Sequence, residues 1–150
     1  MKNIFNGQDN SEIIERLEKL SPDAKALWGK MNVAQMLAHC HIATQMTTGE
    51  INPRRATFPV NIIGRLLKPR MLGPAPLPKN TPTIPEAMIK ETRNFQTEKL
   101  NFTAALKRMA AEGEKCAKAQ FHPFMGKRTP NEWGRINYKH ADHHLKQFGA

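Results

Sequence analysis

Two histidines near the end of the chain stand where a helix that faces a protein core should carry apolar side chains. His140 and His144 are four residues apart, so in a helix they lie about 40° apart on one face, among Trp133, Ile136 and Phe148. Two buried neutral imidazoles leave polar nitrogens to satisfy, and two charged ones repel each other. A divalent metal ion bound by both rings removes both problems. The alternative is a pair of core histidines that hydrogen-bond to the backbone or to each other.

Two imidazoles on one helix leave an ion half bound, so a third ligand must come from another element. His39 and His41 are the candidates, on a helix expected from Asn32 to Thr48. They point about 160° apart around that helix, so both cannot reach one ion. His39 has the more apolar neighbours, which favours it as the inward residue. Because this helix is apolar on nearly all sides, periodicity alone leaves His41 open.

The other histidines fit less demanding positions. Ala141 stands where the metalloprotease motif H-E-x-x-H has its glutamate, so that motif is excluded. His143 lies on the shoulder of the last helix, about 60° from His140, and is expected at the surface or rim. His122 precedes Pro123, which favours extended backbone and a loop.

Two glutamates fall inside the apolar stripe of a third helix, expected from Pro85 to about Lys115. Glu98 and Glu91 are two turns apart, and a carboxylate on an inner face is costly unless it has a partner. One of them could accept a hydrogen bond from a ligand histidine or serve as general base for a metal-bound water. The alternative is a salt bridge with a lysine or arginine at the end of the bundle.

Helical patterns elsewhere in the chain supply the elements that must position these residues, and no stretch alternates with the period of a strand. The sequence predicts a first helix from Ser11 to Leu20 capped by Asp9 or Asn10, a helical turn from Ser21 to Trp28, and a last helix from Pro130 to Gln147 after a Thr129 cap.

Between the second and third helices, the segment from Gly49 to Pro85 is rich in proline, and only Val60 to Leu67 is expected to form a short helical turn. The predicted fold class is therefore all-α, a four-helix bundle with one long proline-rich crossover. A crossover of this length is expected to cover the metal site. Four apolar side chains are expected to line the pocket beneath it, namely those of Phe58, Ile62, Leu66 and Leu67.

The composition sets the broad class of protein. The 150 residues suit one domain, residues 1–150, and carry a net charge of +10. The basic residues are dispersed, and no helix-turn-helix, zinc-finger or RNA-binding signature accompanies them, so a solvated basic surface is favoured over nucleic-acid binding. No apolar run is long enough to span a membrane, and the first residues lack a signal-peptide core. Cys40 and Cys116 are expected to be reduced thiols, so a cytoplasmic location is expected.

Three stretches of the chain resemble the DinB-like (DinB/YfiT-like) metalloenzyme superfamily, closest to a branch of unknown function. Leu27-Trp28 followed by Met31 to His39 looks like the family's entry into helix two, and the proline-rich crossover looks like its long link. Lys139 to Phe148 looks like its helix-four histidine motif, and His122 to Gly126 points to the same branch. The resemblance spans roughly Ser11 to Phe148.

The resemblance implies an up-down-down-up bundle in which His39, His140 and His144 hold one metal ion. Characterised relatives include thiol-S-transferases that use low-molecular-weight thiols. The favoured function is thus a metal-dependent transferase or hydrolase, in which zinc, nickel or iron activates a thiol or water. Its partner would be a small molecule such as a low-molecular-weight thiol, and a homodimer is left open. The alternative is a non-catalytic basic protein with structural histidines that binds nucleic acid or another acidic partner.

Overall fold

Helices make up all the regular structure that is described. The computed structural model describes residues 1–55, 57, 60–119 and 121–150, without the side chains of residues 60, 61, 63, 65 and 67. Within these residues there is no strand, which confirms the all-α fold class. The α-helices are α1 (Gly7–Glu18), α2 (Val33–Thr48), α3 (Val60–Leu72), α4 (Phe95–Glu112) and α5 (Pro130–Gln147), and the 3-10 helices are η1 (Pro85–Ala87) and η2 (Gly113–Cys116).

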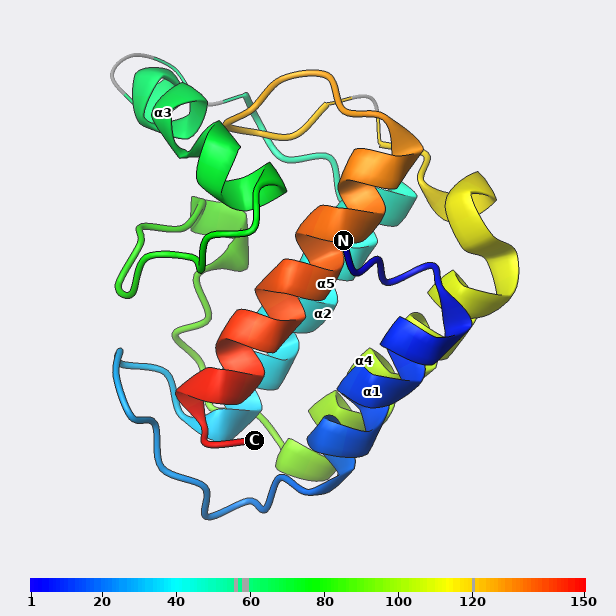
Figure 1. Ribbon diagram of the computed structural model, residues 1–150. Coiled ribbons are helices and arrows are strands. Elements are labelled where there is room, and N and C mark those ends of the chain that lie inside the picture. Colours follow the sequence, from blue (N-terminus) through cyan, green and yellow to red (C-terminus); the bar gives the residue numbers. More distant parts are fainter. Residues whose placement is uncertain (56, 58–59, 120) are drawn as a thin grey trace.

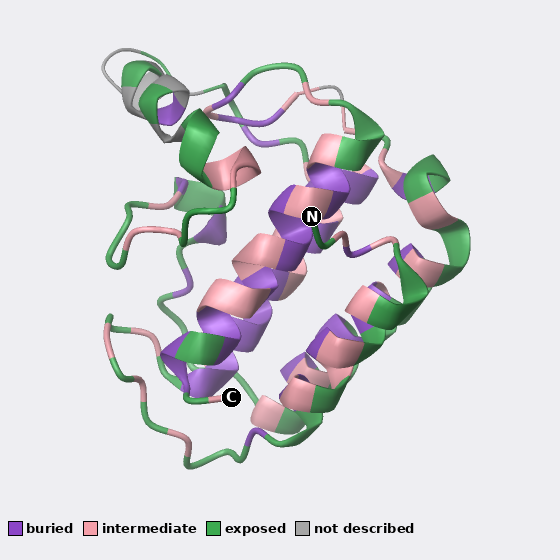
Figure 2. Ribbon diagram, viewed as in Figure 1, coloured by how far each residue is buried: buried purple, intermediate pink, exposed green. Residues whose placement is uncertain are grey.

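Four of the helices pack side by side around the core. In Figure 1, α1 and α5 run in one direction, and α2 and α4 run in the opposite direction. Helix α2 packs against both α4 and α5, and α1 packs against the same two helices from the other side. The buried faces of all four point inward (Figure 2) and include Leu37, Phe102, Leu106 and Leu145. Burial of this apolar surface is what holds the four helices together.

The helices that carry the candidate histidines begin with strong local signals. Asn32 and Gln35 form a capping box at the start of α2, and Gly49 ends the helix in the left-handed conformation. Thr129 and Glu132 form the equivalent box at the start of α5. Because both boxes satisfy backbone N–H groups that a helix start leaves unpaired, the bounds of α2 and α5 agree with those expected from the sequence.

The first helix and the segment after it differ from the prediction. Helix α1 starts at Gly7 because Asn6 caps it, accepting hydrogen bonds from the backbone of Gln8 and Asp9. The expected cap Asn10 is instead buried and donates to the carbonyl groups of Ile4 and Leu106, at 2.8 Å each. The segment from Ser21 to Trp28 forms one turn, in which the backbone N–H of Ala24 donates to the carbonyl of Ser21, but the predicted helical turn does not continue to Trp28, because Leu27 donates to the carbonyl of Gln147 at the end of α5.

The third predicted helix is also shorter than expected. Helix α4 starts at Phe95, where Asn94 accepts a hydrogen bond from the Thr97 backbone, and Pro85 begins only the single 3-10 turn η1. A capping residue at the helix start thus decides the boundary, ten residues later than the apolar stripe indicated. The chain between η1 and α4 is irregular, so Glu91 does not lie on a helix.

The crossover contains a longer helix than its prolines indicated. Helix α3 runs thirteen residues and includes Pro69, near its carboxyl end. It lies beside α5, to one side of the four packed helices (Figure 1). Two cations of α5 hold the end of α3, since Arg135 donates to the carbonyl of Leu72 and Lys139 donates to those of Arg70 and Gly73. Cations suit the carboxyl end of a helix, where carbonyl groups are left unpaired.

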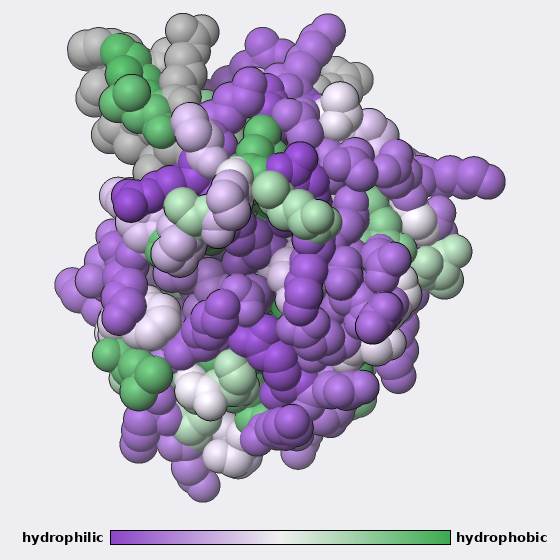
Figure 3. Space-filling view, in the orientation of Figure 1, coloured by the Kyte–Doolittle hydropathy of each residue, from purple (hydrophilic) through white to green (hydrophobic). Residues whose placement is uncertain are grey.

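One face of the molecule is mostly polar. On the face shown in Figure 3, hydrophilic side chains predominate and the apolar ones lie in small separate groups. Of the side chains expected to line a pocket, Ile62 and Leu66 are instead exposed on α3, at 47% and 75%, while Phe58 and the side chain of Leu67 lie outside the described residues. No helix among the described residues is long and apolar enough to cross a membrane.

Candidate metal centre

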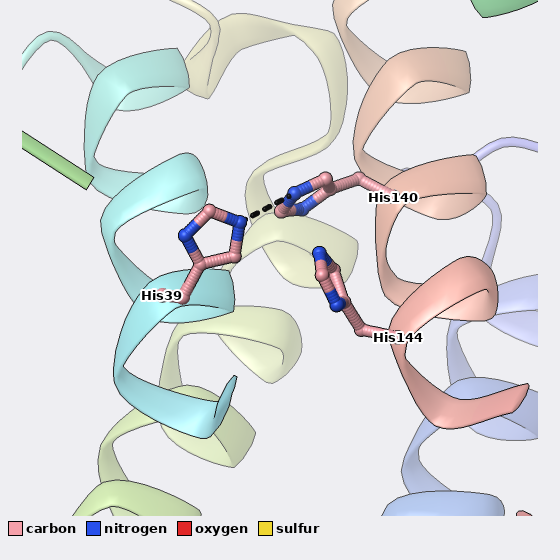
Figure 4. Close-up of side chains that lie close together, drawn as sticks. All are labelled: His39, His140 and His144. Carbon is pink, nitrogen blue, oxygen red and sulfur yellow. Dashed lines mark hydrogen bonds between the residues drawn. The ribbon is translucent and has the colours of Figure 1, made fainter. Parts of the chain in front are cut away.

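Three histidines from two antiparallel helices meet between α2 and α5. The Nε2 atoms of His39 and His140 face each other at 3.0 Å, and a ring nitrogen of His144 points toward the same space (Figure 4). One ligand-type nitrogen from each ring lies within 4.8 Å of the other two. In the part of the chain that the structure describes, this is the one such cluster of three potential ligands. The structure thus selects His39, not His41, as the residue that joins the α5 pair.

The backbone of the crossover determines which nitrogen His39 presents. Its Nδ1 lies 2.8 Å from the carbonyl oxygen of Ala87, in η1. A carbonyl oxygen can only accept, so Nδ1 carries the proton and donates it. In the neutral ring the proton then sits on Nδ1, and Nε2 offers its lone pair to the space shared with His140 and His144. Ala87 therefore sets the tautomer that a metal ligand needs.

A side-chain amide does the same for His144. The amide Nε2 of Gln147 donates to the carbonyl oxygen of Trp28 at 2.6 Å, which turns its Oε1 toward His144. That Oε1 accepts from Nδ1 of His144 at 2.8 Å, so Nε2 of His144 is also left with its lone pair free. Gln147 is 3% exposed. Since both ends of its amide are bonded, it cannot rotate to offer His144 a different partner.

The space between Gln147 and the loop before α2 is closed by a glycine. A Cβ atom at Gly29 would lie 2.5 Å from Nε2 of Gln147, and the φ of +83° at Gly29 is one that residues with a Cβ rarely adopt. A further hydrogen bond joins α5 to α2 three residues before His140: the side-chain amide of Asn137 donates to the hydroxyl of Thr47 at 2.6 Å. The three imidazoles are therefore held by bonds that involve four separate segments of the chain.

Burial keeps the three rings neutral. Burial lowers the pKa of His39, and it lowers that of His144 to about 3, with the neighbouring His39 as the next cause. The pKa of His140 is far below its ordinary value because of burial and because His144 and His39 lie beside it. Neutral imidazole is the form that binds metals. The cluster thus needs no deprotonation at neutral pH before an ion can bind.

The spacing of the nitrogens suits a small divalent ion. For Zn–N bonds of about 2.1 Å, tetrahedral geometry puts two ligand nitrogens about 3.4 Å apart. The observed spacings, from 3.0 Å between His39 and His140 to at most 4.8 Å, bracket that value. If no ion binds, one N–H of His140 can satisfy Nε2 of His39, but Nε2 of His144 has no hydrogen bond among the described residues. The donor set therefore fits a metal better than it fits a closed hydrogen-bonded cluster.

The structure does not bring the predicted carboxylates to this cluster. Glu91 has a largely exposed side chain and pairs with Arg93 at 3.5 Å. Glu98 is buried on α4, as its place in the apolar stripe indicated, but it pairs with the same Arg93 at 3.6 Å. Burial is the larger effect on the pKa of His41 and lowers it, whereas the charge of Glu98 raises it. The salt bridge at the end of the bundle, the alternative reading of the pattern, is what the two glutamates form. Neither one is among the groups that shift the pKa values of His39, His140 or His144.

The remaining histidines lie outside the cluster. His41 is half-buried and lines a cavity of about 280 Å³ between α2 and α4, on the side of α2 away from α5. His122 is buried against Trp133, with ring centroids 5.3 Å apart, and accepts a hydrogen bond from the Phe124 backbone. His143 is half-buried, and its ring centroid is 5.2 Å from that of His144. Among the described contacts, His143 is the one of these three whose ring lies against a cluster ring, whereas His122 only adds to the charges that lower the pKa of His140.

Sequence patterns missed the residues that orient the ligands. Ala87 acts through its carbonyl group, which any residue could supply, so its type carries no signal. Trp28 also acts through its carbonyl, in a segment expected to be helical. Gln147 did carry a signal, because it is a polar amide three residues after His144 on the same apolar face, and such a side chain needs a hydrogen-bond partner there.

Comparison with known proteins assigns the family and corrects one expectation. Residues 4–150 match the family described as "Protein of unknown function (DUF1569)", and the chain belongs to that family. No curated protein and no solved structure matches it. The expected membership of the DinB-like superfamily is therefore wrong. The features that suggested it, histidines at helical spacing and a proline-rich link, are ones that any helical bundle with a histidine cluster can carry.

Proposed function

We propose that this chain binds one divalent metal ion through His39, His140 and His144, and that it uses the ion to activate a small-molecule thiol or water. The observation that carries the proposal is the arrangement of hydrogen bonds around two of the rings. The protons of His39 and His144 are held on Nδ1 by Ala87 and Gln147, so that both Nε2 lone pairs face His140. A cluster that served only to pack the core would not need this arrangement.

The ligand set indicates what the ion could do. Held by three neutral imidazoles and no anion, a divalent ion keeps its full charge and lowers the pKa of a thiol or water that binds beside it. Zinc, nickel and iron all suit imidazole ligands. With Glu91 and Glu98 turned elsewhere, we assign the role of proton acceptor to His143, the imidazole that borders the cluster.

Metal content tests the site directly. Protein purified without a histidine tag should contain about one equivalent of metal per chain by elemental analysis. His39→Ala should lose most of it, whereas His41→Ala, on the same helix, should retain it. Circular dichroism checks that both variants stay helical. Equal loss from the two folded variants, or a wild type that takes up no zinc, nickel or iron, contradicts the proposal.

An activity screen tests the chemistry. The metal-loaded protein should be screened with low-molecular-weight thiols and electrophiles, and separately with simple esters and amides. His140→Ala should abolish any activity found, and His143→Gln should reduce it while metal content stays unchanged. An activity that survives complete removal of the metal rules out the proposed mechanism.

A further inference from the structure

Part of the crossover forms a strap between the two helices of the histidine cluster. The strap runs from Gly73 to Ala87. Lys139 of α5 donates to the carbonyl of Gly73 at 2.7 Å, and His39 of α2 donates to the carbonyl of Ala87 at 2.8 Å. The strap is stiffened by prolines, at positions 74, 76, 78, 82 and 85. Between Gly73 and Pro85 its only charged residue is Lys79.

A tight turn of the strap sets Lys79 against the loop before α2. The hydroxyl of Thr81 donates to the carbonyl of Pro78 at 2.9 Å, and Asn80 has a φ of +56° at the corner. The ammonium of Lys79 lies 4.3 Å from the centre of the Trp28 ring. An exposed cation–π contact of this kind is weak, about 0.5–1 kcal/mol, so Lys79 can leave the ring for an anion.

Two short routes connect Lys79 to the cluster. Through Trp28, the backbone carbonyl bonds to Gln147, which in turn bonds to His144. Through the rings, Trp28 lies 5.6 Å from His143, and His143 lies 5.2 Å from His144. The charge of Lys79 also lowers the pKa of His143, although burial is the larger cause. Lys79 therefore stands at the edge of the metal centre and not on a remote surface.

The charges around this edge select for an anion. Lys79 lies on the strap, Lys139 bonds to its first residue and Arg135 bonds to the end of α3 just before it, and a divalent ion would add to their potential. The neighbouring acid, Asp142, is already paired with Arg16 and Lys146, each at 2.8 Å. Among the described residues, no carboxylate lies within 4.0 Å of the Lys79 ammonium. A site with this balance attracts and orients negative ligands.

We propose that Lys79 binds the carboxylate or other anionic group of a small substrate whose opposite end reaches the metal centre. The inference rests on the proposed metal site and names the class of molecule that the site takes. The stiff strap keeps Lys79 at a set position, so a two-ended anion meets both contacts at little entropic cost. A neutral molecule of the same length gains only the contact at the metal.

Two matched thiols test this proposal without any need for an enzymatic assay. Protein loaded with Co²⁺ is titrated with 6-mercaptohexanoate and with 6-mercapto-1-hexanol, whose chains are long enough to pass two rings, and the thiolate-to-cobalt absorption band reports binding of each. The acid should bind about ten-fold more tightly than the alcohol, as expected for one charge pair near the surface. Lys79→Gln should remove most of that preference but leave Co²⁺ content and binding of the alcohol unchanged.

The matched control is Lys107→Gln, an exposed lysine of α4 whose loss changes net charge equally and should keep the preference. Equal affinities of the two thiols for the wild type, or equal loss of preference in both variants, overturns the role of Lys79 and leaves the metal site standing. If Co²⁺ does not bind, or no band forms with either thiol, both this inference and the proposed function fail.

Discussion

Helix α5 has two adjacent buried faces that hold the protein together in different ways. One face contributes Tyr138, Ala141 and Leu145 to the apolar core shared with α1, α2 and α4. The other carries His140 and His144 on the side that faces α2, where each imidazole has a hydrogen bond with one specific partner. A residue of the first face must have a side chain of suitable volume, whereas a residue of the second must place a specific donor or acceptor atom opposite its partner.

The comparison indicates that the apolar face stabilises the fold, whereas the polar face provides the candidate metal ligands. Apolar burial is non-directional and tolerates similar side chains, so the core can stabilise the bundle without a unique sequence. The polar face costs free energy unless each donor finds its acceptor, which is why it draws on the strap and on the loop before α2. Substitutions in the two faces should therefore separate loss of stability from loss of metal binding.

The largest effect on stability is expected in the apolar face. Phe102→Ala removes a ring that is 2% exposed in the core, and should lower the free energy of unfolding by about 3–5 kcal/mol. Urea denaturation measures this. The folded variant should still bind about one equivalent of metal, whereas His144→Ala should lose the metal. A folded Phe102→Ala protein that binds no metal would show that the two faces are not separable.

Acid should destabilise the metal-free protein through the polar face. The folded pKa of His144 is about 3 and those of His39 and His140 are also low, whereas the unfolded chain titrates near pH 6.5. The contribution of these histidines to the free energy of unfolding is complete above about pH 6.5, and it is lost as the pH falls from there toward the folded pKa values. His144, whose folded pKa is about 3, should reduce stability by about 1.4 kcal/mol per pH unit in that range, and His39 and His140 should add to the loss in the same direction.

The measurement is urea denaturation of the metal-free protein at several pH values between neutrality and mild acid. His144→Asn removes one titrating group and should make the pH dependence shallower by the share of one histidine. Saturating zinc should shift the onset to lower pH, since protons then compete with the metal. A stability that does not change between pH 6.5 and 4.5 would contradict the low pKa values of this face.

A smaller effect is expected where the polar face orients its ligands. Gln147→Leu removes the acceptor for Nδ1 of His144 and should weaken zinc binding about 10- to 100-fold. Gln147→Glu keeps an acceptor there and should retain most of the affinity, although it loses the bond to Trp28. Zinc titration in competition with a chelator gives both values. Equal weakening in the two variants would mean that Gln147 acts only through packing.

The smallest effect is expected on zinc affinity, from a glycine substitution in the loop before α2. Gly29→Ala and Gly113→Ala both place a Cβ at a positive φ, which should cost about 1 kcal/mol of stability at Gly29 and about 1–3 kcal/mol at Gly113, where ψ is −149°. Only at Gly29 does the new Cβ also meet Gln147, because nothing lies within 4 Å at Gly113. Zinc affinity should therefore fall several-fold in Gly29→Ala alone. The same affinity in both variants would show that the loop before α2 does not support the metal centre.

Local patterns determined much of this protein without reference to its tertiary structure. The capping signal at Thr129 predicted the start of α5, the apolar pattern after Asn32 predicted α2, and the spacing of His140 and His144 put both on one face. These features depend on neighbours within a few residues, whose relative positions follow from helix geometry alone. The same reasoning was wrong where two local signals competed, as at Pro85 and Asn94, because a cap and an apolar stripe indicated different starts.

Only the tertiary structure decided which partners the histidines have. Periodicity could not choose between His39 and His41, because α2 is apolar on nearly all sides; the choice depends on how α2 is rotated against α5 and α4. The roles of Ala87 and Trp28 rest on carbonyl groups, which every residue possesses, and on loops that approach from distant parts of the chain. Contacts of this kind depend on how separate elements pack, and no spacing along one element encodes that.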